Sequence, residues 1–206
     1  MTQHRIVFWQ VDAQIDFMIP GGNLYVPGAE NIIPNIDRLV NEARASRVLL
    51  VSSGDAHTPD DPEFKTFPPH CVKGTRGSDI IAEGLATKRL TIPNDASFAL
   101  PQNLDDCQQI ILEKQTLDVF QNPKAAELVD RLGSNVEYVV FGVVTEFCVN
   151  CAVDGLLQRG KKVSVVLDAS ETLKPEEGRR TLHELESRGA RLISTDQAIS
   201  LLASRP

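Results

Sequence analysis

The sequence predicts an α/β fold in three layers, with a doubly wound, mostly parallel sheet of about six strands and helices on both faces. Two observations support this. Short β-branched runs alternate with longer segments of helical periodicity along the chain. Proline and glycine also fall where such helices would begin and end, with Pro123 and Pro175 in first turns and Gly133, Gly160 and Gly189 at the ends.

Each expected element follows from its own pattern. The expected strands are short apolar runs at residues 6–11, 48–51, 110–112, 136–141, 163–167 and 192–194. The expected helices lie between or after them, at residues 30–45, 123–132, 145–159, 175–188 and 196–202. Residues 54–104 break this Rossmann-like rhythm, because they are rich in proline and show only a weak helix at 79–86 and a weak strand at 89–92. Long loops in compact domains are usually functional.

Length and charge limit the class of protein. The chain has 206 residues, with 21 Lys+Arg against 28 Asp+Glu and a net charge of −7. This length predicts a single domain over residues 1–206. The acidic balance and the lack of a basic run argue against nucleic-acid binding. No apolar run approaches the ~20 residues that cross a bilayer, and the N-terminal apolar run is too short for a signal peptide. We therefore expect a cytoplasmic protein with no nucleic-acid or membrane partner and with reduced thiols.

Reactive side chains follow several expected strands. Asp12 closes the first strand, Asp55 follows the second, Lys114 follows the third, and Cys148 lies after the fourth in the first turn of a helix. Ligands of open parallel sheets bind at this edge. The helix dipole and a neighbouring ammonium are expected to lower the thiol's pKa. From these residues alone, a cysteine hydrolase and separate structural roles stay equally open: a capping aspartate, a solvated lysine and a buried thiol.

The pair Cys148 and Cys151 offers a competing interpretation. A C-x-x-C motif between a strand and a helix also occurs in dithiol redox proteins and in zinc sites. The chain has no second C-x-x-C to complete a zinc site, and it has neither of the glycine-rich phosphate-binding patterns. A dithiol or metal-binding protein without hydrolytic turnover is therefore the alternative from another class.

The long central region holds a second group of candidates. Asp55 and His57 stand two residues apart, and Glu63 and His70 follow within the same region. Carboxylate and imidazole donors in this pattern can bind Zn²⁺, Fe²⁺ or Mn²⁺. The alternative is that both histidines are loop residues hydrogen-bonded to the backbone. For Glu63, ligation and a solvated surface position are equally open.

Four segments together resemble one family. They are VDAQIDF at 11–17, DAH at 55–57 with FPPHCVKGT at 67–75, LEK at 112–114, and GVVTEFCV at 142–149. The chain resembles the isochorismatase-like cysteine hydrolases over residues 7–195, and among them the nicotinamidases, also called pyrazinamidases. The second segment separates the nicotinamidase-like members from those without metal.

The resemblance implies a catalytic triad of Asp12, Lys114 and Cys148. Asp12 would move the proton, Lys114 would hold the charges, and Cys148 would form a thioester with the acyl group. The oxyanion would be bound by the N–H groups of Val144 and Cys148, with a non-proline cis peptide between Val143 and Val144. The implied reaction converts nicotinamide to nicotinate and ammonia.

The resemblance also implies a metal site and a substrate pocket. Asp55, His57 and His70 would hold a divalent ion, with zinc the first choice and Fe²⁺ or Mn²⁺ the alternatives, and the ion would bind the pyridine nitrogen. Phe17 and Phe67 would form the aromatic walls. The carboxylates around the ion lead us to expect a neutral amide as substrate.

One departure from the family pattern concerns the substrate. Ala56 stands where many nicotinamidases have tryptophan. This leaves a hydrolase of another small amide or carbamoyl compound as the alternative within the family. Since the family is often oligomeric, we also expect a homo-oligomer.

Overall fold

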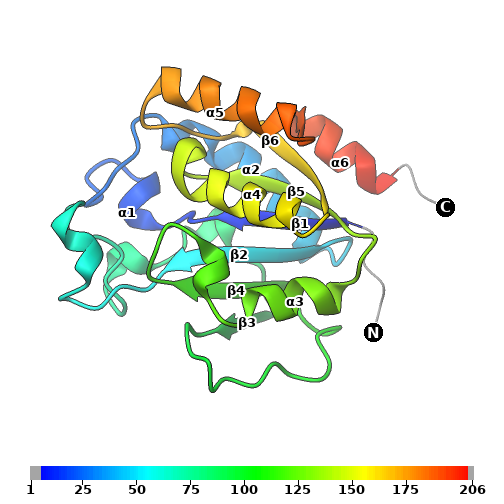
Figure 1. The fold of residues 1–206 in the computed structure, drawn as a ribbon, viewed down its shortest axis with the longest axis horizontal. Coiled ribbons are helices and arrows are strands. Elements are labelled where there is room, and N and C mark those ends of the chain that lie inside the picture. Colours follow the sequence, from blue (N-terminus) through cyan, green and yellow to red (C-terminus); the bar gives the residue numbers. More distant parts are fainter. Residues whose placement is uncertain (1–5, 204–206) are drawn as a thin grey trace.

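The computed structural model describes residues 6–203. These residues form a seven-stranded, wholly parallel sheet in the order β3-β4-β2-β1-β5-β6-β7 (Figure 1). The strands are β1 (Ile6–Val11), β2 (Leu49–Asp55), β3 (Arg89–Ile92), β4 (Gln109–Lys114), β5 (Glu137–Gly142), β6 (Lys162–Ser170) and β7 (Arg191–Ile193). The predicted doubly wound sheet is confirmed. Its additional strand is the weak run at 89–92, which pairs only with β4 and so forms an edge.

Helices cover both faces of the sheet (Figure 1). One face packs against α1 (Ile15–Met18), α2 (Ala29–Arg44) and α6 (Thr195–Ala203). The other packs against α3 (Ala125–Leu132), α4 (Asn150–Gln158) and α5 (Pro175–Ser187). Along β1, Val7, Trp9 and Val11 belong to the second core, whereas Ile6 and Phe8 belong to the first. Because both faces are buried, the strand is apolar without alternation except at Gln10, which is buried as well.

Two expected helices differ in the structure. The weak helix at 79–86 is only a single 3₁₀ turn, η3 (Ala82–Gly84), and the backbone after it bonds to the side chain of a strand residue. Gln109 accepts from the Ala86 N–H at 2.8 Å and donates to the Gly84 carbonyl at 2.9 Å. The helix expected at 145–159 is divided into a π-helix, η5 (Thr145–Val149), followed by α4.

The strand order places a topological switch at β1. On one side of β1 the chain forms β2, then the edge strand β3, then β4 between these two, and it crosses to the other side of β1 to form β5, β6 and β7. Ligand sites of open parallel sheets lie at such a switch, beyond the carboxyl ends of the strands. Asp12 follows β1 directly, and Cys148 lies in the turn after β5.

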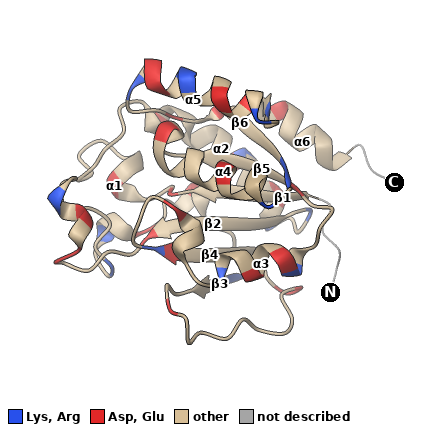
Figure 2. Ribbon diagram, viewed as in Figure 1, with Lys and Arg blue, Asp and Glu red and all other residues tan. Residues whose placement is uncertain are grey.

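The charged residues are dispersed over the outer helices. Figure 2 shows both acidic and basic residues on α3 and α5. None of the helices in residues 6–203 is long and apolar enough to cross a membrane.

Candidate active site and metal centre

Asp12 is held rigidly at the end of β1. Its backbone has φ of 48°, in the left-handed region that aspartate tolerates better than most residues. Its N–H donates to the Ser53 carbonyl at 3.2 Å, and its Oδ1 accepts from the Ser53 hydroxyl at 2.7 Å. The side chain is buried, so β2 fixes both the backbone and the carboxylate of this residue.

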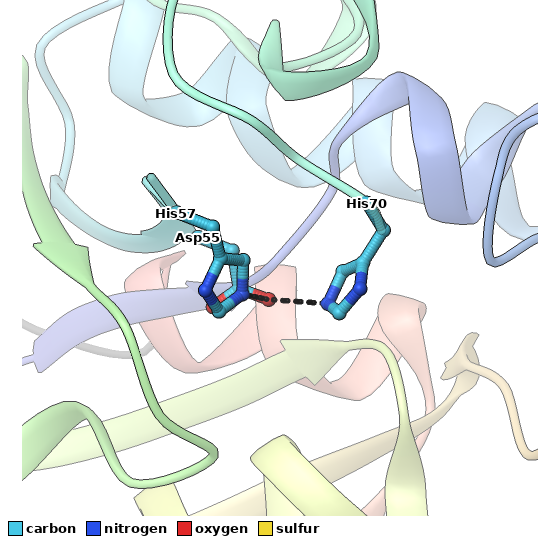
Figure 3. A group of neighbouring side chains, drawn as sticks. All are labelled: Asp55, His57 and His70. Carbon is cyan, nitrogen blue, oxygen red and sulfur yellow. Dashed lines mark ion pairs between the residues drawn. The ribbon is translucent and has the colours of Figure 1, made fainter. Parts of the chain in front are cut away.

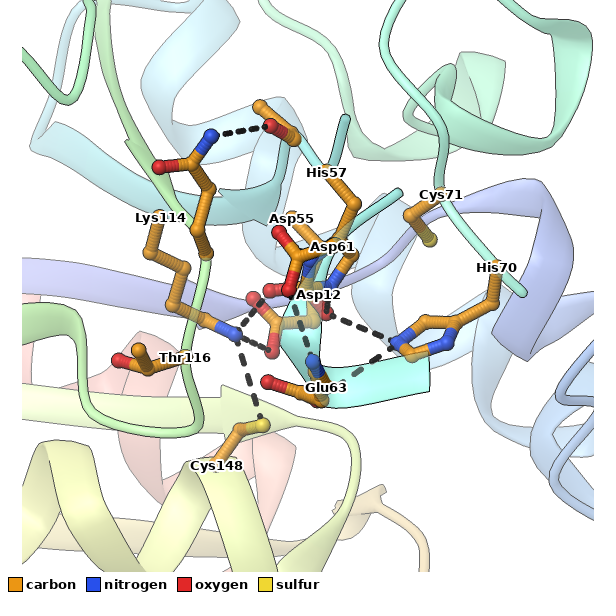
Figure 4. A network of polar contacts seen from close by, with 12 residues as sticks. Asp12, Asp55, His57, Asp61, Glu63, His70, Cys71, Lys114, Thr116 and Cys148 are labelled. Atoms are coloured by element: carbon orange, nitrogen blue, oxygen red, sulfur yellow. Dashed lines mark hydrogen bonds and ion pairs between the residues drawn. The ribbon is translucent and has the colours of Figure 1, made fainter. Parts of the chain in front are cut away.

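Lys114 ends β4 and brings the other groups together. Its ammonium lies 2.9 Å from Asp12 Oδ2 and also pairs with Asp55. It lies 3.6 Å from the Cys148 sulfur (Figure 4). The lysine is 1% exposed, so this charge is balanced entirely by buried groups. A single cation therefore connects the candidate triad to Asp55, the first residue of the candidate metal site.

A tight turn after β5 carries Cys148 back to the sheet edge. Gly142 has φ of 122°, and an added Cβ there would collide with the Val11 backbone. The expected non-proline cis peptide joins Val143 to Val144. Next, the Val149 N–H donates to the Val144 carbonyl at 3.1 Å, which closes the π turn that contains Cys148.

Hydrogen bonds from the loop between β6 and α5 also hold this turn in place. The Glu146 carboxylate accepts from the N–H groups of Leu173 and Lys174 at 3.1 and 2.9 Å and from the Thr172 hydroxyl at 2.6 Å. The loop between β6 and α5 is thereby fastened to the π-helix. The position of Cys148 is thus fixed by both β5 and the following α/β unit.

Burial dominates the electrostatics of the triad. It raises the pKa of the Cys148 thiol well above its usual value, although the Lys114 charge opposes the rise. Burial also raises the pKa of Asp12 against the same opposition. Burial alone would lower the pKa of Lys114, but Asp12 and Asp55 more than reverse this and raise it. The expected net lowering of the thiol's pKa is therefore wrong, and the thiol keeps its proton until a base removes it.

Asp55, His57 and His70 form the candidate metal centre (Figure 3). Ligand atoms of the three lie within 4.8 Å of one another, and all three residues are buried. Both histidines turn Nε2 toward Asp55 Oδ2, at 3.7 Å from His57 and 3.6 Å from His70. Both ring nitrogens of His57 are buried; among the described residues Nε2 has no hydrogen-bond partner, and Nδ1 has the Asp61 carboxylate at 3.0 Å as an ion-pair contact without aligned hydrogen-bond geometry. A buried imidazole with an unused lone pair, facing a carboxylate and a second imidazole, fits a divalent ion such as Zn²⁺.

Glu63 lies at the margin of this group. Its Oε1 is 3.9 Å from His70 Nε2, and its side chain is 15% exposed. Partial burial and the nearby Asp55 charge raise the pKa of Glu63. The partly buried carboxylate lies beside the group formed by Asp55, His57 and His70 without being one of the three residues whose ligand atoms converge, so ligation by Glu63 stays a prediction.

Aromatic rings surround the centre. Phe17 and Phe67 lie 5.3 and 6.4 Å from the His70 ring, measured between centroids, so both expected wall residues reach the site. Two rings that the sequence did not single out join them. Phe64 lies 5.2 Å from His57, and Phe147, beside the nucleophile, lies 6.2 Å from Phe67.

Two further residues were not anticipated from the sequence. Ser53 bonds to Asp12 because the register pairs it with Val11, and pairing between distant strands leaves no local signal. Asp61 lies with Oδ2 3.0 Å from His57 Nδ1. The sequence signal that could have indicated this contact is that Asp61 stands four residues after His57.

The second cysteine of the C-x-x-C motif takes no part in the cluster. Cys148 and Cys151 are both free thiols, and the metal-binding group found in residues 6–203 contains no cysteine. Burial also raises the pKa of Cys151. The described residues therefore offer no support for a zinc site built on this motif.

The comparisons with known proteins agree with one another on the family of this chain. The isochorismatase domain model matches residues 7–88 and 88–197. The nicotinamidase of Saccharomyces cerevisiae is 24% identical, over 89% of this chain and 96% of its own. The structure of the pyrazinamidase of Pyrococcus horikoshii in complex with zinc aligns with a TM-score of 0.74 at 26% identity, covering 92% of this chain and 99% of that one. The N-carbamoylsarcosine amidase of Thermoplasma acidophilum shares the fold, with a TM-score of 0.73 at 21% identity over 93% of this chain and 97% of its own.

Proposed function

This chain belongs to the isochorismatase family, and from that premise we propose that it is a metal-assisted cysteine amidohydrolase that converts nicotinamide to nicotinate and ammonia. The observation that carries the proposal is that one buried cation, Lys114, contacts the thiol, the base and the metal-site carboxylate together. Relatives named nicotinamidase and pyrazinamidase support the choice of substrate.

In the first half of the reaction, Asp12 removes the proton from the Cys148 thiol. The sulfur attacks the amide carbon, and the N–H groups of Val144 and Cys148 receive the oxyanion. The carbon–nitrogen bond then breaks, the proton on Asp12 passes to the leaving nitrogen, and ammonia departs. The acyl group remains on Cys148 as a thioester. Lys114 keeps its charge throughout and offsets the negative charge that forms on sulfur.

In the second half, Asp12 takes a proton from water and the resulting hydroxide attacks the thioester carbon. The carbon–sulfur bond breaks, the acid is released and loses its proton to solvent as nicotinate, and the proton on Asp12 returns to the thiolate. Asp12 thus serves as base and acid in turn, which suits a carboxyl group whose pKa is raised by burial. Because the thiol is buried and protonated at rest, thiolate forms only when Asp12 is ready to accept its proton.

Asp55, His57, His70 and Glu63 would hold the metal ion, and we propose zinc because this mixed oxygen and nitrogen donor set suits it. When bound, the ion supplies a Lewis acid for the pyridine nitrogen of the substrate. The surrounding rings of Phe17, Phe64 and Phe67 provide flat apolar contacts for a planar heterocycle. The carboxylates of the site favour a neutral amide over an acid.

Ammonia release from a panel of amides tests this proposal. We expect nicotinamide to be hydrolysed far faster than benzamide, which has the same shape but lacks the pyridine nitrogen, and we expect a chelator to reduce that preference. N-carbamoyl compounds serve as the competing class, since a family relative of that name shares the fold. Release from a carbamoyl compound with none from nicotinamide would overturn the proposed substrate while keeping the triad.

A further inference from the structure

The two carboxylate oxygens of Asp61 contact two different residues of the candidate metal centre, Glu63 and His57. Asp61 lies between His57 and Glu63 and is 7% exposed. Its Oδ1 accepts from the Glu63 N–H at 3.0 Å, which caps the 3₁₀ turn η1 (Pro62–Lys65). Its Oδ2 lies 3.0 Å from His57 Nδ1 (Figure 4).

The contact with His57 bears on which ring nitrogen carries the proton. A neutral imidazole has one N–H and one lone pair, and the environment decides which nitrogen has which. A carboxylate at Nδ1 favours the proton there. The lone pair is then on Nε2, the nitrogen that faces Asp55 and lies on the same side as His70.

The Nδ1 atom of His70 also has a hydrogen-bonding partner, but this partner is a neutral backbone carbonyl and not a carboxylate. His70 Nδ1 lies 2.8 Å from the Pro68 carbonyl, so its Nε2 is likewise left for the centre. Metal-binding histidines in proteins usually donate their second N–H to a carboxylate or a backbone carbonyl, and a carboxylate makes the ring the more basic ligand. His57 has the carboxylate of Asp61 as this partner, and His70 has the backbone carbonyl of Pro68.

We propose that Asp61 is a positioning residue for the metal, an inference that rests on the metal site of the proposed function. It holds His57 as the Nδ1–H tautomer with Nε2 directed at the ion. Through the Glu63 N–H it also fixes the turn that directs the Glu63 carboxylate toward the same point. One buried carboxylate thereby orients two of the four candidate ligands.

Zinc affinity of the purified full-length protein, measured by competition with a chromogenic chelator, tests this role. We expect Asp61→Ala to weaken Zn²⁺ binding by about 10- to 100-fold, the range typical of groups that orient a metal-binding histidine. Asp61→Asn should fall between this variant and the wild type, because its amide oxygen can still cap η1 and accept from Nδ1 without the charge. Asp60→Ala is the matched control: Asp60 is the exposed neighbour, and its loss should leave the affinity unchanged.

Nitrogen-15 NMR of His57 in the metal-free protein gives a readout that a merely structural role would not move. At a pH where the His57 ring is neutral, we expect the Nδ1–H signature in the wild type and a shift toward the other tautomer in Asp61→Ala. Unchanged zinc affinity and an unchanged tautomer in a folded Asp61→Ala protein would overturn the proposal. If that variant does not fold, the same two results in Asp61→Asn overturn it.

Ammonia release from nicotinamide by the wild type separates this inference from the proposed function. A wild type that binds zinc without turnover refutes the function and leaves the Asp61 variants to decide the role of Asp61. A wild type that binds no zinc refutes the metal site and this inference with it.

Discussion

The triad and the metal centre are built on different supports. Asp12 directly follows β1 and Lys114 ends β4, the two strands that flank β2 in the sheet, and Cys148 lies in the turn that follows β5. His57, Glu63 and His70 instead lie in the long segment after β2, where short 3₁₀ turns replace regular structure. The strand ends fix the reacting groups through the sheet's own hydrogen bonds, whereas the loop is held by an isolated bridge between His57 and Val72 and by side-chain contacts such as those of Asp61. Substitutions in the two regions should therefore affect different quantities, turnover in the first and metal or substrate binding in the second.

The largest effect should come from the nucleophile. Cys148→Ala removes the atom that forms the thioester, and we expect kcat for amide hydrolysis to fall by at least about 10³-fold, since removing a catalytic nucleophile costs this much or more in other hydrolases. Zinc content should be unchanged, because the sulfur is not part of the metal group. Ammonia release and elemental analysis measure the two quantities.

Cys151→Ala is the matched control for that experiment. It keeps the triad intact and should retain activity within about two-fold, as expected for a residue outside the reacting groups. If Cys148→Ala kept full turnover, the proposed triad would be wrong. Loss of activity in Cys151→Ala alone would instead favour the dithiol interpretation.

The next effect should come from the loop. We expect His70→Ala to weaken zinc binding by more than about 100-fold, beyond the range for groups that only orient a ligand. The rise in KM for nicotinamide should exceed the fall in kcat, because the triad remains on its strands. Chelator competition and steady-state kinetics on the same preparation test this. A variant with full zinc content, or one that loses only kcat, would contradict the division between the two regions.

The sequence carried more information about the strand-end region than about the loop. Asp12, Lys114 and Cys148 could be found because each follows an apolar run, and parallel topology brings such positions to one edge. The spacing of Asp55, His57 and His70 indicated a metal site, but the contact of Asp61 depends on how the loop folds over it. The direction of the thiol's pKa was missed for a similar reason. Helix position is local information, whereas burial of Cys148 depends on packing among segments distant in the chain.

A smaller effect should appear in the pH dependence of the triad. Asp12 acts as a base only when ionised, so activity should fall as pH decreases through its pKa, which burial raises above the ordinary 3.8. The Ser53 hydroxyl stabilises the ionised form through its hydrogen bond to Oδ1. Ser53→Ala should raise this pKa further and shift the acid limb of kcat/KM to higher pH by about one unit, since one such bond contributes roughly 1.5 kcal/mol.

Ser52→Ala provides the control for this shift. Ser52 is the buried neighbour, and its hydroxyl bonds to Gln10 and Gln109 instead of to Asp12. Its replacement should leave the acid limb in place. An acid limb that moves equally in both variants would show that the effect is one of packing near β2 and not of the bond to Asp12.

The smallest effect should come from Glu63, which lies outside the group of three converging ligands and next to His70. Glu63→Gln keeps the size of the side chain and removes the charge, so we expect zinc binding to weaken by roughly 10-fold if a single weaker oxygen replaces an ionised ligand. The effect should be greater above the pKa of Glu63 than below it. That pKa is raised by partial burial and by Asp55, and below it the wild-type carboxyl is also uncharged. Zinc affinity measured at several pH values tests this. Equal affinities of wild type and variant across the whole range would remove Glu63 from the ligand set, and the loop would then hold the ion through Asp55, His57 and His70 alone.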